Sequence, residues 1–562
     1  MRHSKRTLAF LAAACVAASG CSPQGKVTDN GSTVVFQQQQ EPDKLNPVIS
    51  DMMATIDATT PMLEGLVQVD DQMRFFPQLA AKVPTLENGL VAREGKGMVV
   101  TYPLRPNVKW HDGQPFTAED VQFTWQVYMN EKTMVTSKTG YDKITAVEIL
   151  DPHTVKMHFK EIFSPYLGIF STILPKHVLA KDLASEDSIN KSAFNQHPIG
   201  TGPFKFKEWV SGDHLTMVRF DDYYINRPHI AAIKMRIVPD ENAAFTLLKS
   251  GELDIYQSAA IGQYDAIKRL TNVKVSADPG LTYEHLDFNM QKPKLKDKRV
   301  RQAVAYAINR KQISEKIYSG LYPVAYADLC PMSWAYPKPL ENSYAYNPDK
   351  SKQLLEEAGW KLGPDGIRVY RGQDPAIKPG ERLSFTITST AGRKPRELTE
   401  LVFRHYFKQV GMELVIDNQP GSTMFAGYPD GTLKGGKFDI ALYAQTAPPD
   451  PDADYSVFHS SQIPGKGNNG QNNAHYKSQA VDDLLVQGQL ELAQDKRAAI
   501  YLEMEKHVMD DLPIFPLLYW ATLNPYNKRL MNFKANPSNA GNLWNTWEWD
   551  VQSPTAMKAS KE

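Results

Sequence analysis

The stretch LSFTITSTAGRKPRELTELVFRHYFKQVGMELVI, residues 383–416, decides the class of fold. Its first part, 383–388, is a short run of β-branched and aromatic residues typical of a strand. Residues 395–410 are helical in character and stop at Gly411, the residue type that most often ends a helix. Residues 413–416 again predict a strand. This order is one βαβ unit, in which the two strands pair in parallel through a right-handed crossover.

The alternation of helix and strand patterns continues on both sides of this unit, which predicts an α/β protein. Thr117 and Asp297 each precede an apolar periodic run and are expected to cap a helix. A long helical region covers 478–510, with a break expected at Gly488. Residues 98–160 instead hold short strands around one helix, which predicts a separate α+β segment.

Composition excludes several classes of protein. The chain has 562 residues, with 63 Lys and Arg, 63 Asp and Glu, and 42% hydrophobic residues. These values are close to the globular average and exclude a disordered chain, a collagen-like fibre and a multi-span membrane protein. The chain has no basic excess, so no nucleic-acid partner is expected. Three cysteines cannot build a disulfide scaffold.

The N-terminus has the pattern of a bacterial leader. Residues 1–20 combine three basic residues with a short apolar core and small residues before Cys21. The core is too short for a membrane span and is typical of a signal peptide. The small residues followed by Cys21 resemble a lipobox, which predicts that Cys21 becomes the lipidated N-terminus of the mature protein. Residues 21–32 would then be the anchor and a flexible linker.

Common catalytic and metal signatures are absent from the sequence. It contains no Cys-x-x-Cys, His-Glu-x-x-His or Gly-x-Ser-x-Gly. Gly465, Gly467 and Gly470 match a dinucleotide fingerprint, but no strand precedes them and no helix start follows. His111 and Asp112 are adjacent and are interpreted as part of a turn. We therefore expect no enzyme activity, no catalytic residue, no metal ligand and no cofactor.

Four stretches together resemble the family 5 extracellular solute-binding proteins of ABC importers, the oligopeptide, dipeptide and nickel group. They occur in family order and cover nearly the whole chain after the leader. The four are TYPLRPNVKWHDGQPFTAEDVQFTW (101–125), PIGTGPF (198–204), LDFNMQKPKLKDKRVRQAVAYAINRKQI (286–313), and PDPD (449–452) with NNAHYKSQAVDDLL (472–485).

The resemblance implies a type II periplasmic-binding-protein fold, with two hinged lobes and an additional α+β domain inserted in the first lobe. The insertion would be the α+β segment, and the second lobe would hold the βαβ unit. The implied boundaries are 1–20 for the signal peptide, 21–32 for the anchor and linker, 30–66, 199–282 and 505–550 for lobe I, 67–198 for the inserted domain, and 283–504 for lobe II.

The resemblance also implies a mechanism and a set of partners. The protein would capture a peptide or peptide-like solute between its lobes and deliver it to an ABC permease in the inner membrane. Ligand binding would shift the population towards the closed state, and the permease would recognise that state. We expect a monomer outside the cytoplasm, in the periplasm, tethered through Cys21 to the inner or the outer membrane.

Candidate ligand-binding residues follow from the resemblance and from the strand ends, where open α/β sheets bind ligands. In peptide-binding members an Asp pairs with the peptide amino group and a Trp precedes it by three residues, but these positions are Ala447 and Ala444 here. This departure argues against free-amine peptides, because a buried ammonium needs a carboxylate partner. Asp450 and Asp452 are the nearest carboxylates, either as substitutes or as structural turn residues. The candidates are Tyr283, Tyr443, Gln445, Thr446, Asp450 and Asp452.

Two alternatives remain at this point. The same transport role could serve an oligosaccharide, an opine or a metal chelate. The protein could also be a receptor or chaperone without a transport role, or an enzyme.

Overall fold

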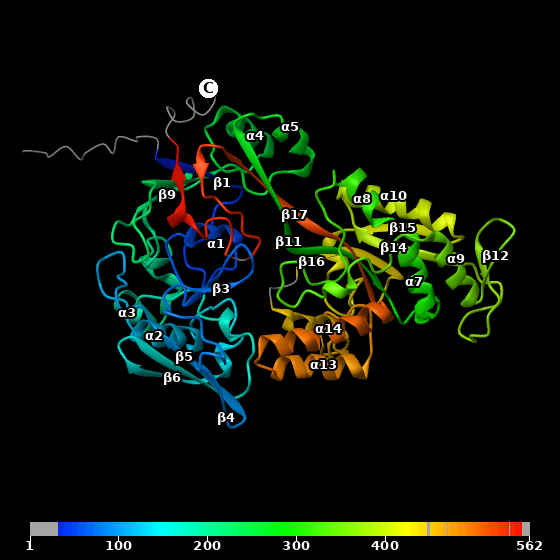
Figure 1. The fold of residues 1–562 in the computed structure, drawn as a ribbon, viewed down its shortest axis with the longest axis horizontal. Helices are drawn as coiled ribbons and strands as arrows, with labels where there is room; N and C mark the ends of the chain where they lie inside the picture. The colour runs from blue at the N-terminus through cyan, green and yellow to red at the C-terminus, as the bar shows by residue number, and fades with distance from the viewer. Residues whose placement is uncertain (1–31, 447–449, 469, 539, 553–562) are drawn as a thin grey trace, which may run out of the picture.

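Two bodies linked by one pair of long strands make up the structure, a computed structural model that describes residues 32–446, 450–468, 470–538 and 540–552 (Figure 1). The expected leader, Cys21 and Ala447 lie outside the described residues. Within those ranges no helix has the length and apolar character needed to cross a membrane. Cys330 is buried and unbonded to another cysteine.

Lobe I is built on a four-stranded sheet in the order β1-β10-β9-β8. The first pair is parallel and the other two pairs are antiparallel. The adjoining helices include α1 and α4. The bounds are β1 Thr33–Gln38, β8 Phe204–Val210, β9 His214–Arg219, β10 Ala232–Ile237, α1 Met53–Thr59 and α4 Glu241–Ser250.

The inserted domain is the α+β segment that the sequence predicts. Its antiparallel sheet has the order β4-β5-β7-β6, and a two-stranded sheet β2-β3 precedes it. Thr117 caps α2 as expected, because its side chain accepts from the Glu119 N–H. The bounds are β2 Val67–Val69, β3 Phe75–Pro77, β4 Val91–Glu94, β5 Gly97–Pro103, α2 Ala118–Met129, β6 Ile144–Asp151, β7 Thr154–Phe159 and α3 Lys176–Leu183.

Lobe II is built on a five-stranded mixed sheet in the order β15-β14-β16-β11-β17. The predicted βαβ unit is confirmed: β14 pairs in parallel with β15 through α10, with Ser384 opposite Glu413. Asp297 caps α7 by accepting from the Arg299 N–H. The bounds are α7 Lys298–Ala307, α8 Arg310–Ile317, α9 Pro348–Glu357, β14 Ser384–Thr390, α10 Lys394–Gln409, β15 Glu413–Gln419, β16 Ile440–Thr446, α12 Asp454–Phe458, α13 Gln479–Leu490 and α14 Gln494–Asp511.

The break in the long helical region lies after Gly488, not at it. Helix α13 continues through Gly488 to Leu490, and α14 begins at Gln494. A Cβ atom on Gly488 would lie 2.7 Å from the Tyr501 ring. The glycine therefore allows close packing of α13 on α14 and does not end the helix.

A single antiparallel ladder joins the lobes. It pairs β11 (Val273–Phe288) with β17 (Ile514–Asn527), and its register shifts between Pro279 and Tyr283. From Thr282 onwards β11 also pairs with β16, within the sheet of lobe II. The expected return at 505 falls within α14, where Glu505 is buried in lobe II, so the chain returns to lobe I later, along β17. The two-lobed fold with an inserted domain is as predicted.

Candidate functional site

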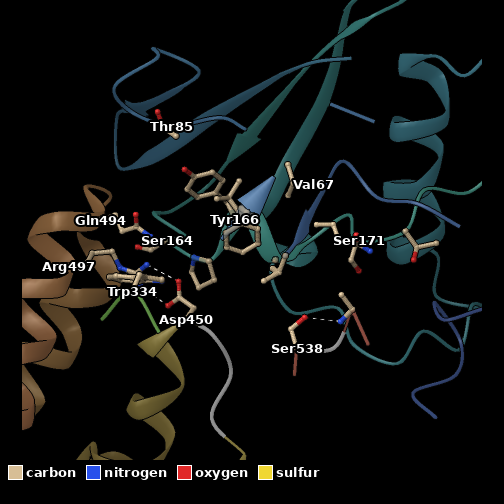
Figure 2. Close-up of a pocket in the computed structure, with 18 of the residues that line it drawn as sticks. Val67, Thr85, Ser164, Tyr166, Ser171, Trp334, Asp450, Gln494, Arg497 and Ser538 are labelled. Carbon is tan, nitrogen blue, oxygen red and sulfur yellow. Dashed lines mark hydrogen bonds and ion pairs between the residues drawn. The ribbon is translucent and has the colours of Figure 1, made fainter. Parts of the chain in front are cut away.

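A cavity of about 770 Å³ lies between the two lobes (Figure 2). Its volume is in the range of about 300–1,000 Å³ that small-molecule sites occupy. Lobe I contributes α1 and the segment around Ser538, the inserted domain contributes β2 and residues 164–172, and lobe II contributes residues near Trp334 and α14. All three parts of the molecule therefore meet at one site.

The wall from lobe I and the inserted domain is largely apolar. Leu63 comes from the turn that follows α1, Phe75 from β3, and Tyr166 from the segment that follows β7. Val67, Gln68 and Val69, the whole of β2, also line the cavity. Within the described residues β2 pairs with β3 alone, so its second edge has no strand partner.

The wall from lobe II is organised by an ion pair. Arg497, on α14, binds both carboxylate oxygens of Asp450 at 2.7 and 2.8 Å. Its guanidinium also lies over the Trp334 ring, 5.1 Å from the centroid, and donates to the Gly488 carbonyl at 3.1 Å. Burial lowers the pKa of Arg497, but the hydrogen bonds and charge of Asp450 outweigh it, so the pKa is raised. The pair therefore stays charged and fixes the position of both side chains (Figure 2).

The inserted domain contacts lobe II directly beside the cavity. The Ser164 hydroxyl donates to the carbonyl oxygens of Gln489 and Glu491 at 2.6 and 2.9 Å. Arg93, on β4, donates to the Leu490 carbonyl at 2.7 Å. Both contacts end on the last turn of α13 and the residue that follows it, so any movement of one lobe relative to the other must change them.

A second cavity, of about 190 Å³, lies at the end of β16. It brings together three predicted residues, Tyr283, Gln445 and Thr446. The Thr446 and Thr282 hydroxyl oxygens lie 2.9 Å apart. Burial, with the charge of nearby Asp328, raises the pKa of Tyr283 well above its ordinary value, so the phenol is neutral.

The other predicted residues are placed differently. Asp450 lines the larger cavity, but Arg497 occupies its carboxylate and the Asp452 N–H also donates to it at 3.0 Å. Tyr443 lines neither cavity: it is buried and donates to Asp287 at 2.7 Å. Asp452 also lines neither of the two, and one of its oxygens is buried without a hydrogen-bond partner. Ala444 lies on β16 and is half-buried.

Two groups of residues at the site could not be recognised from the sequence around them. Arg497 is one basic residue of an amphipathic helix, and only the tertiary fold places it against Asp450. Asp328, Asp454 and Glu505 come from three distant segments, yet their carboxylates gather beside the smaller cavity. Spacing along the chain could identify neither group.

Comparison with known proteins gives a consistent result. Residues 75–466 match the family described as bacterial extracellular solute-binding proteins, family 5 middle. The oligopeptide-binding protein AppA of Bacillus subtilis is 28% identical over 552 residues, covering 96% of each chain.

Solved structures give the same result. AppA from Bacillus subtilis in complex with a nonapeptide superimposes with a TM-score of 0.65 at 28% identity, covering 93% of this chain and 99% of the other. NikZ from Campylobacter jejuni in complex with Ni(L-His) superimposes with a TM-score of 0.67 at 27% identity, covering 92% and 99%.

Proposed function

The chain belongs to the bacterial extracellular solute-binding proteins of family 5, and on that basis we propose that it captures a peptide or peptide-like solute and delivers it to an ABC permease. One observation carries the proposal: the 770 Å³ cavity has walls from lobe I, the inserted domain and lobe II. A solute there contacts both lobes at once. It therefore binds the closed arrangement more tightly than an open one and shifts the population towards closure.

The lining of the cavity supports an extended, partly apolar solute. The second edge of β2 has no strand partner and, apart from the Val69 carbonyl, which accepts from the Asn536 side chain at 3.0 Å, offers backbone groups to a peptide main chain, in the manner of strand addition. Leu63, Phe75, Tyr166 and Trp334 supply apolar and aromatic surface for side chains. The relative AppA, whose solved structure holds a nonapeptide, supports the same class of solute.

We expect no free amino terminus to be held by Asp450; the other carboxylates that line the cavity are Glu87 and Asp495. Asp450 is the nearest predicted carboxylate, but it is bound by Arg497 and by the Asp452 N–H. A ligand ammonium would have to displace a two-bond ion pair. We therefore propose that main-chain hydrogen bonds and apolar contacts provide most of the affinity, and that Asp450 acts as a structural residue of the cavity wall.

The first experiment identifies the solute. The chain without residues 1–21 is purified and the bound material is released and analysed by mass spectrometry. A mixture of peptides supports the proposal. An oligosaccharide, an opine or a metal chelate would contradict the peptide assignment while preserving the transport role, and turnover of a substrate would contradict the binding-protein assignment.

The second experiment tests the cavity with a matched pair of variants. Thr60 lines the cavity, and its hydroxyl donates to the Ile56 carbonyl four residues earlier at 2.8 Å. Thr246, exposed on α4, makes the same bond to the Asn242 carbonyl at 2.8 Å. Thr60→Phe should fill the cavity and weaken binding of the identified solute at least 100-fold in calorimetry, whereas Thr246→Phe should leave it unchanged. Equal affinity in both variants would place the solute elsewhere.

The cellular setting is part of the same proposal. Cys21 would carry lipid and hold the protein at a membrane outside the cytoplasm, beside its permease, as a monomer. Expression with a labelled fatty acid should label the wild-type chain and not Cys21→Ser. Fractionation should then find the variant in the soluble extracytoplasmic fraction. Label that persists in the variant would exclude Cys21 as the modified residue.

A further inference from the structure

Three buried carboxylates meet beside the smaller cavity. Asp328 lies in the segment between α8 and α9, Asp454 begins α12, and Glu505 lies on α14. One carboxylate oxygen from each residue lies within 4.8 Å of one oxygen from each of the other two. Each residue is at most 2% exposed.

Three carboxylate oxygens of this group lack the hydrogen-bond donor that a buried carboxylate needs. Both oxygens of Glu505 and the Oδ2 atom of Asp454 are buried without a hydrogen-bond partner. Asp328 accepts a bond from the Leu329 N–H, at 3.1 Å. The side chain of Glu505 reaches the other two from a different helix and ends against them. An uncompensated buried charge is strongly destabilising, so this arrangement requires a positive charge or bound protons.

No cation of the described chain compensates the group. The nearby guanidinium is that of Arg497, which is bound to Asp450. Burial, followed by the charge of Asp328, raises the pKa of both Asp454 and Glu505 well above their ordinary values. The charges that act on these two residues belong to neighbouring aspartates, an environment that a bound cation would reverse.

We propose that Asp328, Asp454 and Glu505 bind a divalent, oxygen-preferring cation of the Ca²⁺ type. The donors are all carboxylate oxygens, the ligands of hard cations. Two oxygens on opposite sides of a Ca²⁺ ion lie about 4.6–5.2 Å apart, given bonds of ~2.3–2.6 Å, so one ion can span the group. The adjoining cavity of 190 Å³ has Asp328 and Asp454 in its wall and offers room for the waters that complete the coordination.

Such an ion would join the segments that form one wall of the solute cavity. Helix α14 carries both Glu505 and Arg497, and the segment that carries Asp450 continues directly into Asp454. The bound cation would therefore fix the position of the Asp450–Arg497 pair. It is a structural site, distinct from the solute cavity and independent of which solute binds.

The test uses the chain without residues 1–21, treated with a chelating resin and then given Ca²⁺, Mg²⁺ or Mn²⁺ alone at about pH 8. We expect one equivalent of metal to remain after desalting, measured by elemental mass spectrometry, and a rise in Tm with Ca²⁺. Glu505→Gln should lose both the bound metal and the rise in Tm. Its Tm without metal should exceed that of the wild type, because one repelling carboxylate is gone.

Glu400→Gln is the matched control. Glu400 is also a buried glutamate of lobe II, with one unpartnered oxygen and a pKa raised to about 7 by burial. This variant should keep the metal and the rise in Tm. Asp454→Asn repeats the test if Glu505→Gln does not fold.

Two results would overturn the proposal. A wild type that retains no metal and shows no change in Tm with any of the three ions would show that protons neutralise the group. Equal metal binding by the wild type and Glu505→Gln would place the ion elsewhere. Neither result bears on solute capture, since no solute is present.

Discussion

Two groups of carboxylates in one wall of lobe II differ in how their charge is compensated. Asp450 faces Arg497 in a two-bond ion pair. Asp454 begins α12 and lies against two other carboxylates, those of Asp328 and Glu505. Two aspartates four positions apart thus differ in what lies opposite them. The Arg497 guanidinium pairs with Asp450, whereas no such pair with a basic side chain of the described residues is formed by Asp454. Burial alone does not determine what an acidic residue does; the charge opposite it does.

The largest effect is expected from breaking the paired group. Arg497→Met removes the guanidinium and leaves the Asp450 carboxylate, 26% exposed, without its partner. Loss of one partner of a buried pair costs about 3–5 kcal/mol, and the partial exposure of Asp450 favours the lower end. Urea unfolding followed by tryptophan fluorescence should show the loss in free energy of unfolding, and adding Asp450→Asn should restore part of it.

An exposed pair provides the control for that measurement. Arg382 and Asp365 are 44% and 49% exposed, and such pairs contribute about 0–1 kcal/mol. Arg382→Met should therefore leave the free energy of unfolding almost unchanged. If both methionine variants unfold alike, the Asp450–Arg497 pair is not an important structural contact.

The next effect concerns another buried acid, Glu64, whose hydrogen-bond partners are neutral hydroxyls. It accepts from the hydroxyls of Tyr223, Thr201 and Tyr224 at 2.7, 2.9 and 3.1 Å. Burial, only partly offset by these bonds and by the charge of Arg105, raises its pKa from 4.5 to about 7. The folded state thus favours the protonated form, and this contribution to stability is full below about pH 4.5 and is lost as the pH rises through about 7.

Glu64→Gln isolates this contribution. The free energy of unfolding of the wild type relative to the variant should fall by up to about 3 kcal/mol between about pH 4.5 and 8, since each pKa unit corresponds to ~1.4 kcal/mol. The measurement is urea unfolding across that range. A difference that does not change with pH would show that hydroxyl partners suffice to keep a buried carboxylate charged.

The smallest effect is that of Asp454→Asn, which is compared with the same substitution at Asp450. Without metal, Asp454→Asn should raise the free energy of unfolding by about 1 kcal/mol or more at about pH 8, because a repelling charge is removed. Asp450→Asn should lower it, because Arg497 loses its partner. Thermal unfolding of the two variants in the same buffer checks the signs. The same sign for both would remove the distinction between the groups.

Local patterns predict much of this fold. The strand, helix and strand of residues 383–416 pair as expected, and Thr117 and Asp297 cap their helices, because these features depend on neighbours in the sequence. The break assigned to Gly488 is wrong. A glycine serves either to end a helix or to allow close packing, and only the tertiary contact with Tyr501 distinguishes the two.

Less of the candidate site than of the fold could be predicted from local sequence patterns. Tyr283, Gln445 and Thr446 come together at the end of a strand as the topology implies, and Asp450 reaches the larger cavity. The partner of Asp450 was not predictable, because Arg497 follows a helical periodicity shared by many surface residues. Whether a side chain faces solvent, a cavity or an opposite charge is decided by packing between distant segments.

The ladder of β11 and β17 also has a consequence for how the chain folds. The Arg529 side chain, just beyond β17, donates to the Thr33 carbonyl, 496 residues earlier in the chain. Lobe II lies almost entirely between the two ladder strands, so its core can form from one continuous segment as synthesis proceeds. Lobe I can complete its fold only after the C-terminal segment has been synthesised. Bringing its distant segments together therefore costs the larger loop-closure entropy. The lobe that contains the first residues to be synthesised is therefore the last to complete its fold.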